Sequence, residues 1–214
     1  MKKRSTLKVV AVAAFLAFTG LAQAQQTIKI ANIVELSGPG TTAGTLFKNG
    51  VELAVKEINE NGGILGKKIE STTVDTQTNP GVAKGLTQKA VDDGVLAIFG
   101  PVYSGSIMVS MAESKRGELP NFTGGEAAAI TQQGNPYVFR TAFGQSTSFP
   151  KLVKYINTKA KTLAVIYVNN DFGKGGRDTL TKLMTGGPTQ IVADISTDAG
   201  SSGFFSRRVE SQAK

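Results

Sequence analysis

"TIKIANIVELSGPGTTAG", residues 27–44, joins an apolar stretch to a turn rich in glycine, and the fold follows from what lies on either side of that turn. Residues 27–36 are mostly apolar and β-branched, which is typical of a buried strand. After the turn, apolar residues recur at steps of three and four from Ala43 to Ile58, which indicates a helix with one apolar face. Glycines at 62 and 63 then end that helix. Strand, turn and helix in this order form the repeating unit of a parallel sheet with crossover helices.

The same alternation continues along the chain. Further strands are expected at residues 67–75, 95–100, 119–122 and 136–142, with helices at 79–94 and 104–115. After residues 143–150 the pattern starts again, with helices at 151–160 and 172–184 and strands at 161–168 and 189–196. We therefore predict an α/β fold with a doubly wound parallel lobe over residues 25–142 and a partial second α/β lobe over 143–214. A sheet of only two clear strands rarely stands alone.

The N-terminus has the layout of a secretory signal. Lys2, Lys3 and Arg4 precede an apolar run from residue 9 to 21, and "AQA" follows at 22–24. This order of a basic start, a short apolar run and small residues predicts cleavage after Ala24 and export to the periplasm. The run is shorter than the ~20 residues that a spanning helix needs. Because Lys2, Lys3, Arg4 and Lys8 lie in the signal, the net charge falls from +8 to +4 without it.

Composition excludes several classes of enzyme. The chain has no histidine and no cysteine, which rules out histidine-dependent serine triads, thiol catalysis and the usual zinc ligand sets. "SFPK", residues 148–151, matches a serine acylase spacing, but a proline lies inside it and its companion motifs are absent. No basic stripe with interleaved aromatic residues suggests nucleic acid binding. We expect no catalytic residue, no metal and no cofactor, and hence no enzyme.

Three turns follow expected strands and are rich in glycine and hydroxyl residues: 37–44, 100–106 and 122–127. Ligands of open parallel sheets bind outside the carboxyl ends of the strands, where helix N-termini offer N–H groups to an anion. Ser104 is expected to be the N-cap of the helix after the third strand. Nucleotide binding remains a minor alternative, because no G-x-G-x-x-G follows the first strand and "NGGILGKK", residues 61–68, departs from a P-loop at both ends.

Four stretches carry a resemblance to a known family: residues 35–70, "IFGPVYSGS" at 98–106, "GNPYVFRT" at 134–141 and "AVIYVNNDFGKGG" at 164–176. They resemble the periplasmic solute-binding proteins of branched-chain amino acid ABC transporters. The resemblance implies a type I periplasmic binding fold, in which two α/β lobes close over a ligand and the loaded protein, expected to be a monomer, delivers it to permease subunits. Members of that family continue well beyond residue 214, so the chain is expected to be truncated at its C-terminus.

The resemblance also implies a ligand site made of three segments: the turn after the third strand, the turn after the fourth, and the start of a helix in the second lobe. In the family, the first turn seats the ligand carboxylate, the second faces its ammonium group, and the third supplies an aromatic ring. The matching residues here are Val102, Tyr103, Ser104, Gly124, Gly125, Glu126 and Phe172. Glu126 departs from the usual threonine, and its carboxylate must pair with an ammonium group or turn outward. Phe172 could equally pack on its own lobe.

Two classes of function remain at this stage. One is a transport receptor for a small amino acid, with branched-chain amino acids as the first choice, or a non-functional fragment of such a receptor. The other is a ligand-sensing module of the same fold that responds to an amide or a small organic acid. The export signal favours transport, because a cytoplasmic sensor does not need one.

Overall fold

The computed structural model describes residues 27–200. The predicted signal sequence lies outside the described residues, and so does a further helix that the sequence suggests at residues 203–214. Within them, no helix combines the length and the apolar character needed to cross a membrane.

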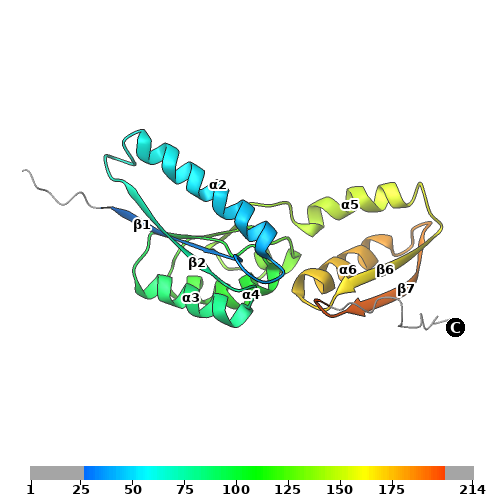
Figure 1. Ribbon diagram of the computed structural model, residues 1–214. Coiled ribbons are helices and arrows are strands. Elements are labelled where there is room, and N and C mark those ends of the chain that lie inside the picture. Colours follow the sequence, from blue (N-terminus) through cyan, green and yellow to red (C-terminus); the bar gives the residue numbers. More distant parts are fainter. Residues whose placement is uncertain (1–26, 201–214) are drawn as a thin grey trace, which may run out of the picture.

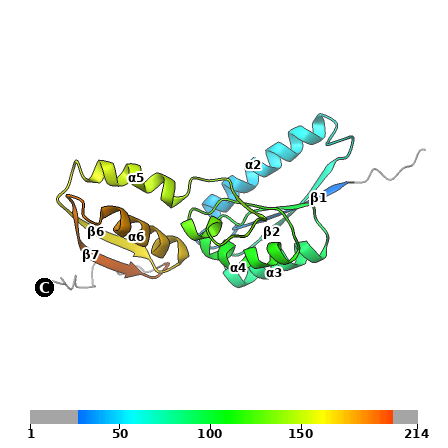
Figure 2. The same ribbon diagram turned by 180° about the vertical axis from the view of Figure 1, so that it is seen from behind.

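The first lobe is built on a parallel sheet. Among the described residues it has five strands in the order β2-β1-β3-β4-β5, all parallel. The strands are β1 (Ile28–Val34), β2 (Ile69–Asp75), β3 (Ala97–Phe99), β4 (Asn121–Thr123) and β5 (Val138–Arg140). The helices are α2 (Thr41–Glu60), α3 (Pro80–Asp92), α4 (Ser104–Arg116) and the short 3-10 helix η2 (Ala128–Thr131). Figures 1 and 2 show α2 on one face of the sheet and α3 and α4 on the other, which is the predicted doubly wound arrangement.

Helices on both faces bury the central strands, as parallel sheets require. Ile33 of β1 and Ile98 of β3 are fully buried and pack with Ala90 of α3. A second cluster joins Ile107 of α4 to Val138 of β5. These two clusters fix α3 and α4 beneath the sheet, so the N-terminus of α4 lies at the carboxyl end of β3.

The second lobe has a two-stranded parallel sheet of β6 (Thr162–Val168) and β7 (Gln190–Thr197) with α5 (Gln145–Ile156) and α6 (Asp171–Met184). Leu163 and Val165 of β6 pack against buried Val153 and Leu180 of the two helices. Side chains alternate along a strand, so Ile166 points to the opposite face, where it is 60% exposed. Figure 1 shows both helices on one side of this sheet.

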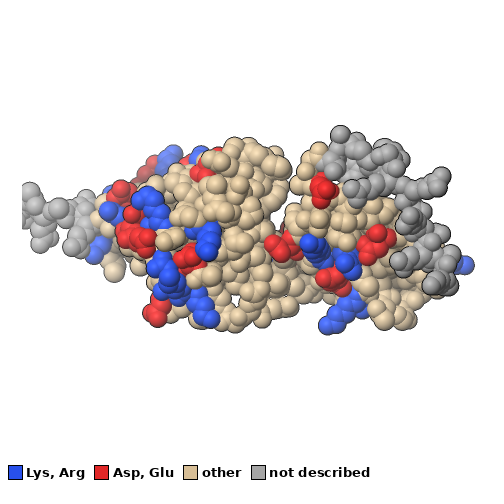
Figure 3. Space-filling model, turned by 90° about the horizontal axis from the view of Figure 1, so that it is seen from below, with Lys and Arg blue, Asp and Glu red and all other residues tan. Residues whose placement is uncertain are grey.

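Charged side chains are unevenly distributed over the molecule. On the face seen in Figure 3, lysine, arginine, aspartate and glutamate gather at the far end of the first lobe and on the second lobe. The part of the first lobe next to the second shows none of them in this view. On this face, uncharged groups therefore line the first lobe's side of the junction, whereas the second lobe shows charged groups close to it.

Most elements lie close to their predicted ranges, but α5 begins at Gln145, six residues before the predicted start at 151. Residues 143–150 suggested a linker because they contain Pro150, which the structure places inside the helix. A proline at this position removes one backbone hydrogen bond and crowds the carbonyl four residues before it, but the helix continues to Ile156. The lobe boundary between residues 142 and 143 stays a prediction.

Leu46 was expected on the inner face of α2 and is 68% exposed instead. The buried residue at this end of the helix is Gly44, whose position allows the backbone of Glu35 to approach. Two positions along a helix correspond to a rotation of about 200°. Leu46 therefore points away from the sheet.

Candidate functional site

The turn between β3 and α4 comes within contact distance of β1. A Cβ atom on Gly100 would lie 1.9 Å from the carbonyl oxygen of Ile33. The φ angle of Gly100 is +94°, which is unfavourable for residues other than glycine. Helix α4 then begins at Ser104, with Tyr103 in the N-cap position. The expectation that Ser104 is the N-cap is therefore wrong. Its side chain turns inward instead, is 3% exposed, and its Oγ accepts a hydrogen bond from the backbone N–H of Ala127 at 3.2 Å.

The turn after β4 packs directly on this serine. A Cβ on Gly125 would lie 2.3 Å from Cδ1 of Ile107 and 3.3 Å from Oγ of Ser104, so the close fit depends on glycine. Gly124 faces Val102, whose Cγ1 would be 3.2 Å from a Cβ at that position. The structure thus brings together the two turns that the sequence predicted as parts of one site.

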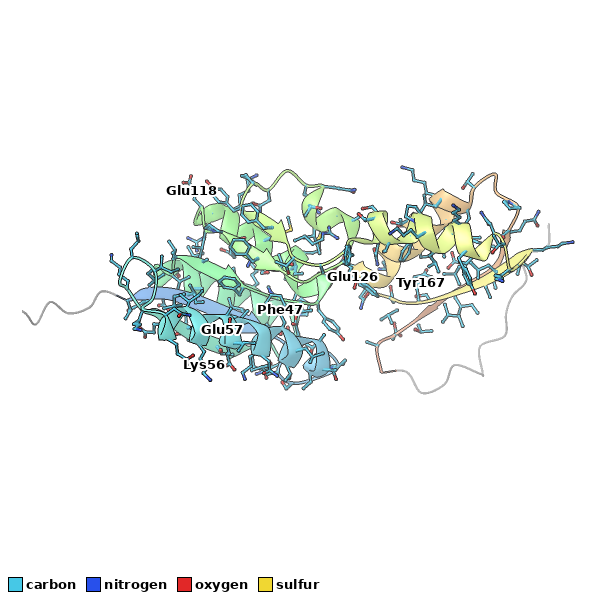
Figure 4. All side chains as sticks on the ribbon, turned by 90° about the horizontal axis from the view of Figure 1, so that it is seen from above. Phe47, Lys56, Glu57, Glu118, Glu126 and Tyr167 are labelled. Atoms are coloured by element: carbon cyan, nitrogen blue, oxygen red, sulfur yellow. The ribbon has the colours of Figure 1, made fainter. Side chains whose placement is uncertain are left out.

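Arg140 of β5 holds the backbone of the second turn, a role that the sequence analysis missed. Its guanidinium donates to the carbonyl oxygens of Glu126 at 2.7 Å and Ala127 at 2.8 Å, and to Oγ1 of Thr131 at 3.0 Å. Burial lowers the pKa of Arg140, while the negative charge of Glu126 opposes that shift. The side chain of Glu126 is exposed, and Figure 4 shows it at the junction of the two lobes.

Glu35 was also missed, because it reads as the end of a strand. Its carboxylate is fully buried and accepts hydrogen bonds from the backbone N–H groups of Val102 at 3.0 Å and Tyr103 at 3.1 Å. Burial raises the pKa of Glu35, although these two bonds oppose the shift. The phenol of Tyr103 donates to the carbonyl of Pro39 at 3.1 Å. The sequence signal that could have identified Glu35 is the position of an acidic residue between an apolar strand and a glycine-rich turn.

Phe172 lies in the first turn of α6, behind the N-cap Asn170, whose side chain accepts from the N–H of Gly173 at 2.9 Å. The Phe172 ring is 45% exposed. Across the junction, Asp171 at the start of α6 lies close to the start of α4. A Cβ atom placed on Gly105 would be 3.5 Å from Oδ2 of Asp171. The start of α6 therefore faces the turn that carries Ser104.

The described residues contain no group of three or more acidic, histidine or cysteine side chains that could hold a metal ion. The site offers the hydroxyl of Ser104, backbone N–H groups at the start of α4, and apolar surface from Val102 and Phe47. The ring of Phe47, like Val102, borders Gly124. Figure 4 shows Phe47 on α2. This combination suits a small ligand with one anionic end and an apolar body.

Comparison with known proteins decides the family. The model of the family described as "Periplasmic binding protein" matches residues 27–211. The chain belongs to this family. It is 36% identical over 188 residues to the Leu/Ile/Val-binding protein BraC3 of Rhizobium johnstonii, covering 86% of this chain and 51% of that protein. It is 30% identical over 205 residues to the leucine-specific-binding protein of Salmonella typhimurium, covering 94% of this chain and 55% of that protein.

Solved structures agree with this assignment. The chain matches the branched-chain amino acid transporter substrate-binding protein LivJ of Streptococcus pneumoniae, in complex with isoleucine, with a TM-score of 0.76 and 31% identity. The match covers 84% of this chain and 52% of that one. The predicted type I periplasmic binding fold is confirmed. The chain spans about half the length of the relatives it matches. Those relatives are named as binding proteins, in agreement with the expectation that the chain is not an enzyme.

Proposed function

We propose that this periplasmic binding protein chain captures a small amino acid, with branched-chain amino acids as the first choice, between its two lobes. We also propose that it acts in the periplasm after export and delivers the ligand to the permease subunits of an ABC transporter. The two relatives described above are named for binding leucine, isoleucine and valine, and for binding leucine specifically, which supports this choice.

One observation carries the proposal. Three segments meet at the carboxyl ends of β3 and β4: Ser104, the turn of residues 124–126 and the start of α6. A hydrogen bond from the N–H of Ala127 joins the turn to Ser104, and Asp171 brings the start of α6 against Gly105. The first N–H groups of α4 have no partner within the helix, so they are available to the carboxylate of an amino acid. The serine hydroxyl can donate its hydrogen to the same carboxylate while its oxygen accepts from Ala127.

The other end of the ligand has matching partners. An ammonium group is compatible with the exposed carboxylate of Glu126, and the half-exposed ring of Phe172 provides apolar surface for an aliphatic side chain. In this arrangement Glu126 pairs with the ammonium group rather than with the ligand's carboxylate, because two carboxylates repel each other.

Titration calorimetry of the purified chain tests the proposal. L-leucine, L-isoleucine and L-valine are titrated separately, with D-leucine and benzoate as comparison ligands. We expect saturable binding of at least one L-amino acid and none of D-leucine. A folded protein that binds none of the three would contradict the proposal, and one that binds only benzoate would favour the small organic acid alternative.

A further inference from the structure

Gln145 is a buried polar residue at the joint between the lobes. It is the first residue of α5, the helix that follows the last strand of the first sheet, and it is 1% exposed. Glutamine is rarely this buried unless its amide has partners. Figures 1 and 2 show the start of α5 and the start of α6 next to the first lobe.

Two hydrogen bonds connect Gln145 to the two sides of the candidate site. Its backbone N–H donates to the carbonyl oxygen of Glu126 at 2.9 Å. Its side-chain Nε2 donates to the carbonyl oxygen of Phe172 at 2.8 Å. One residue thus contacts the first-lobe turn and the second-lobe segment that both belong to the predicted site.

Helix α6 packs closely against Gln145 at Gly176, and Gly175 lies in ordinary contact distance of it. A Cβ atom on Gly176 would lie 2.9 Å from Nε2 of Gln145, and one on Gly175 would lie 3.4 Å from Oε1 and 3.8 Å from Cβ of Ala127. The absence of a side chain at Gly176 therefore lets α6 pack against the amide of Gln145. Among the described residues, Oε1 has no hydrogen-bond partner, so the side chain holds α6 through the single Nε2 bond and through packing.

We propose that Gln145 is a positioning residue that sets the distance between Phe172 and the turn carrying Ser104, and thereby the affinity of the site. The expected effect of Gln145 on ligand affinity rests on the proposed function. Its expected effect on the distance between Phe172 and the turn carrying Ser104 does not. The backbone bond to Glu126 does not depend on the side chain, whereas the bond to Phe172 does. Replacing the side chain should therefore free the start of α6 while leaving the first-lobe turn in place.

The test measures distance and affinity on the full chain with Gln145→Met and Gln145→Glu. Methionine keeps the approximate volume and removes the donor, and glutamate keeps the shape and turns the donor into an acceptor that faces a carbonyl oxygen. The exposed Gln132→Met is the matched control. Because the chain has no cysteine, spin labels can be attached to Asn49→Cys on α2 and Lys182→Cys on α6, both exposed.

We expect both Gln145 variants to broaden the distance distribution between the labels and to weaken L-leucine binding roughly 5- to 10-fold, the effect of losing one neutral hydrogen bond. Gln132→Met should leave both unchanged. Distributions as narrow as in the wild type, with affinity within about twofold, would overturn the proposal even if the melting temperature falls. If the wild type binds no amino acid, the proposed function fails, and the distance distribution alone decides the role of Gln145.

Discussion

Oε1 of Glu35 lies 3.1 Å from the backbone nitrogen of Tyr103, although 68 residues separate them along the chain. The other carboxylate oxygen accepts from Val102, so this one side chain binds both residues that precede Ser104. The carboxylate at the end of β1 therefore fixes the start of α4, where the proposed ligand carboxylate is bound.

Glu35→Ala should destabilise the protein strongly. It leaves the part-buried N–H groups of Val102 and Tyr103 without an acceptor, and an unsatisfied group costs about 1–3 kcal/mol when it is buried. We expect the free energy of unfolding to fall by about 2 kcal/mol or more, measured by urea denaturation. The exposed Glu57→Ala on α2, labelled in Figure 4, is the control and should stay within about 0.5 kcal/mol of the wild type. Equal effects of the two substitutions would contradict this role for Glu35.

The pH dependence of stability should also report on Glu35. Burial raises the pKa of its carboxyl above the ordinary 4.5, so the folded state holds this proton more tightly than the unfolded state does. The resulting stabilisation is complete below pH 4.5 and is lost as the pH rises through the raised value. The free energy of unfolding of the wild type minus that of Glu35→Gln should therefore fall from pH 4 toward neutral pH. A difference that rises over that range would show that the pKa shift has the opposite sign.

Gly44 and Gly50 of α2 form a matched pair. A Cβ on Gly44 would lie 2.0 Å from the carbonyl oxygen of Glu35, whereas one on Gly50 meets nothing within 4 Å. Gly50→Ala should stabilise the protein by up to about 1 kcal/mol through helix propensity. Gly44→Ala should lower the melting temperature, because α2 must move away from β1. Thermal unfolding followed by circular dichroism checks both, and a stabilising Gly44→Ala would refute the close packing.

The two faces of the second sheet should respond differently to substitution. Leu180 is buried among the helices and strands of this lobe. Leu180→Ala should therefore lower the free energy of unfolding by about 2–5 kcal/mol. Ile166 is 60% exposed on the other face, and Ile166→Thr should change the free energy of unfolding by about 0.5 kcal/mol or less. It should also reduce self-association in analytical ultracentrifugation, because it removes apolar surface. A large loss of stability from Ile166→Thr would mean that another part of the chain covers this face.

Periodicity in the sequence was sufficient to predict the alternation of strands and helices, because the pattern of buried residues repeats within each element. Contacts between distant residues were not predictable in this way. Ser104 was expected to cap α4, but its hydroxyl accepts from Ala127, 23 residues away. Glu35 and Gln145 were missed for the same reason, since their partners lie 67 and 27 residues distant. The grouping of Val102 with Gly124 followed from family resemblance and strand order rather than from local pattern.

The affinity of Ser104→Ala for L-leucine, relative to that of the wild type, decides whether this serine binds the ligand. The substitution removes a hydroxyl that can donate to the ligand's carboxylate, and a hydrogen bond to a charged group contributes about 1.5–3 kcal/mol. We expect roughly 10- to 150-fold weaker binding by titration calorimetry. Ser114→Ala, which removes a buried hydroxyl that donates to the carbonyl oxygen of Met111 within α4, should bind like the wild type. Unchanged affinity in a folded Ser104→Ala protein would contradict this role for Ser104 and place the ligand elsewhere.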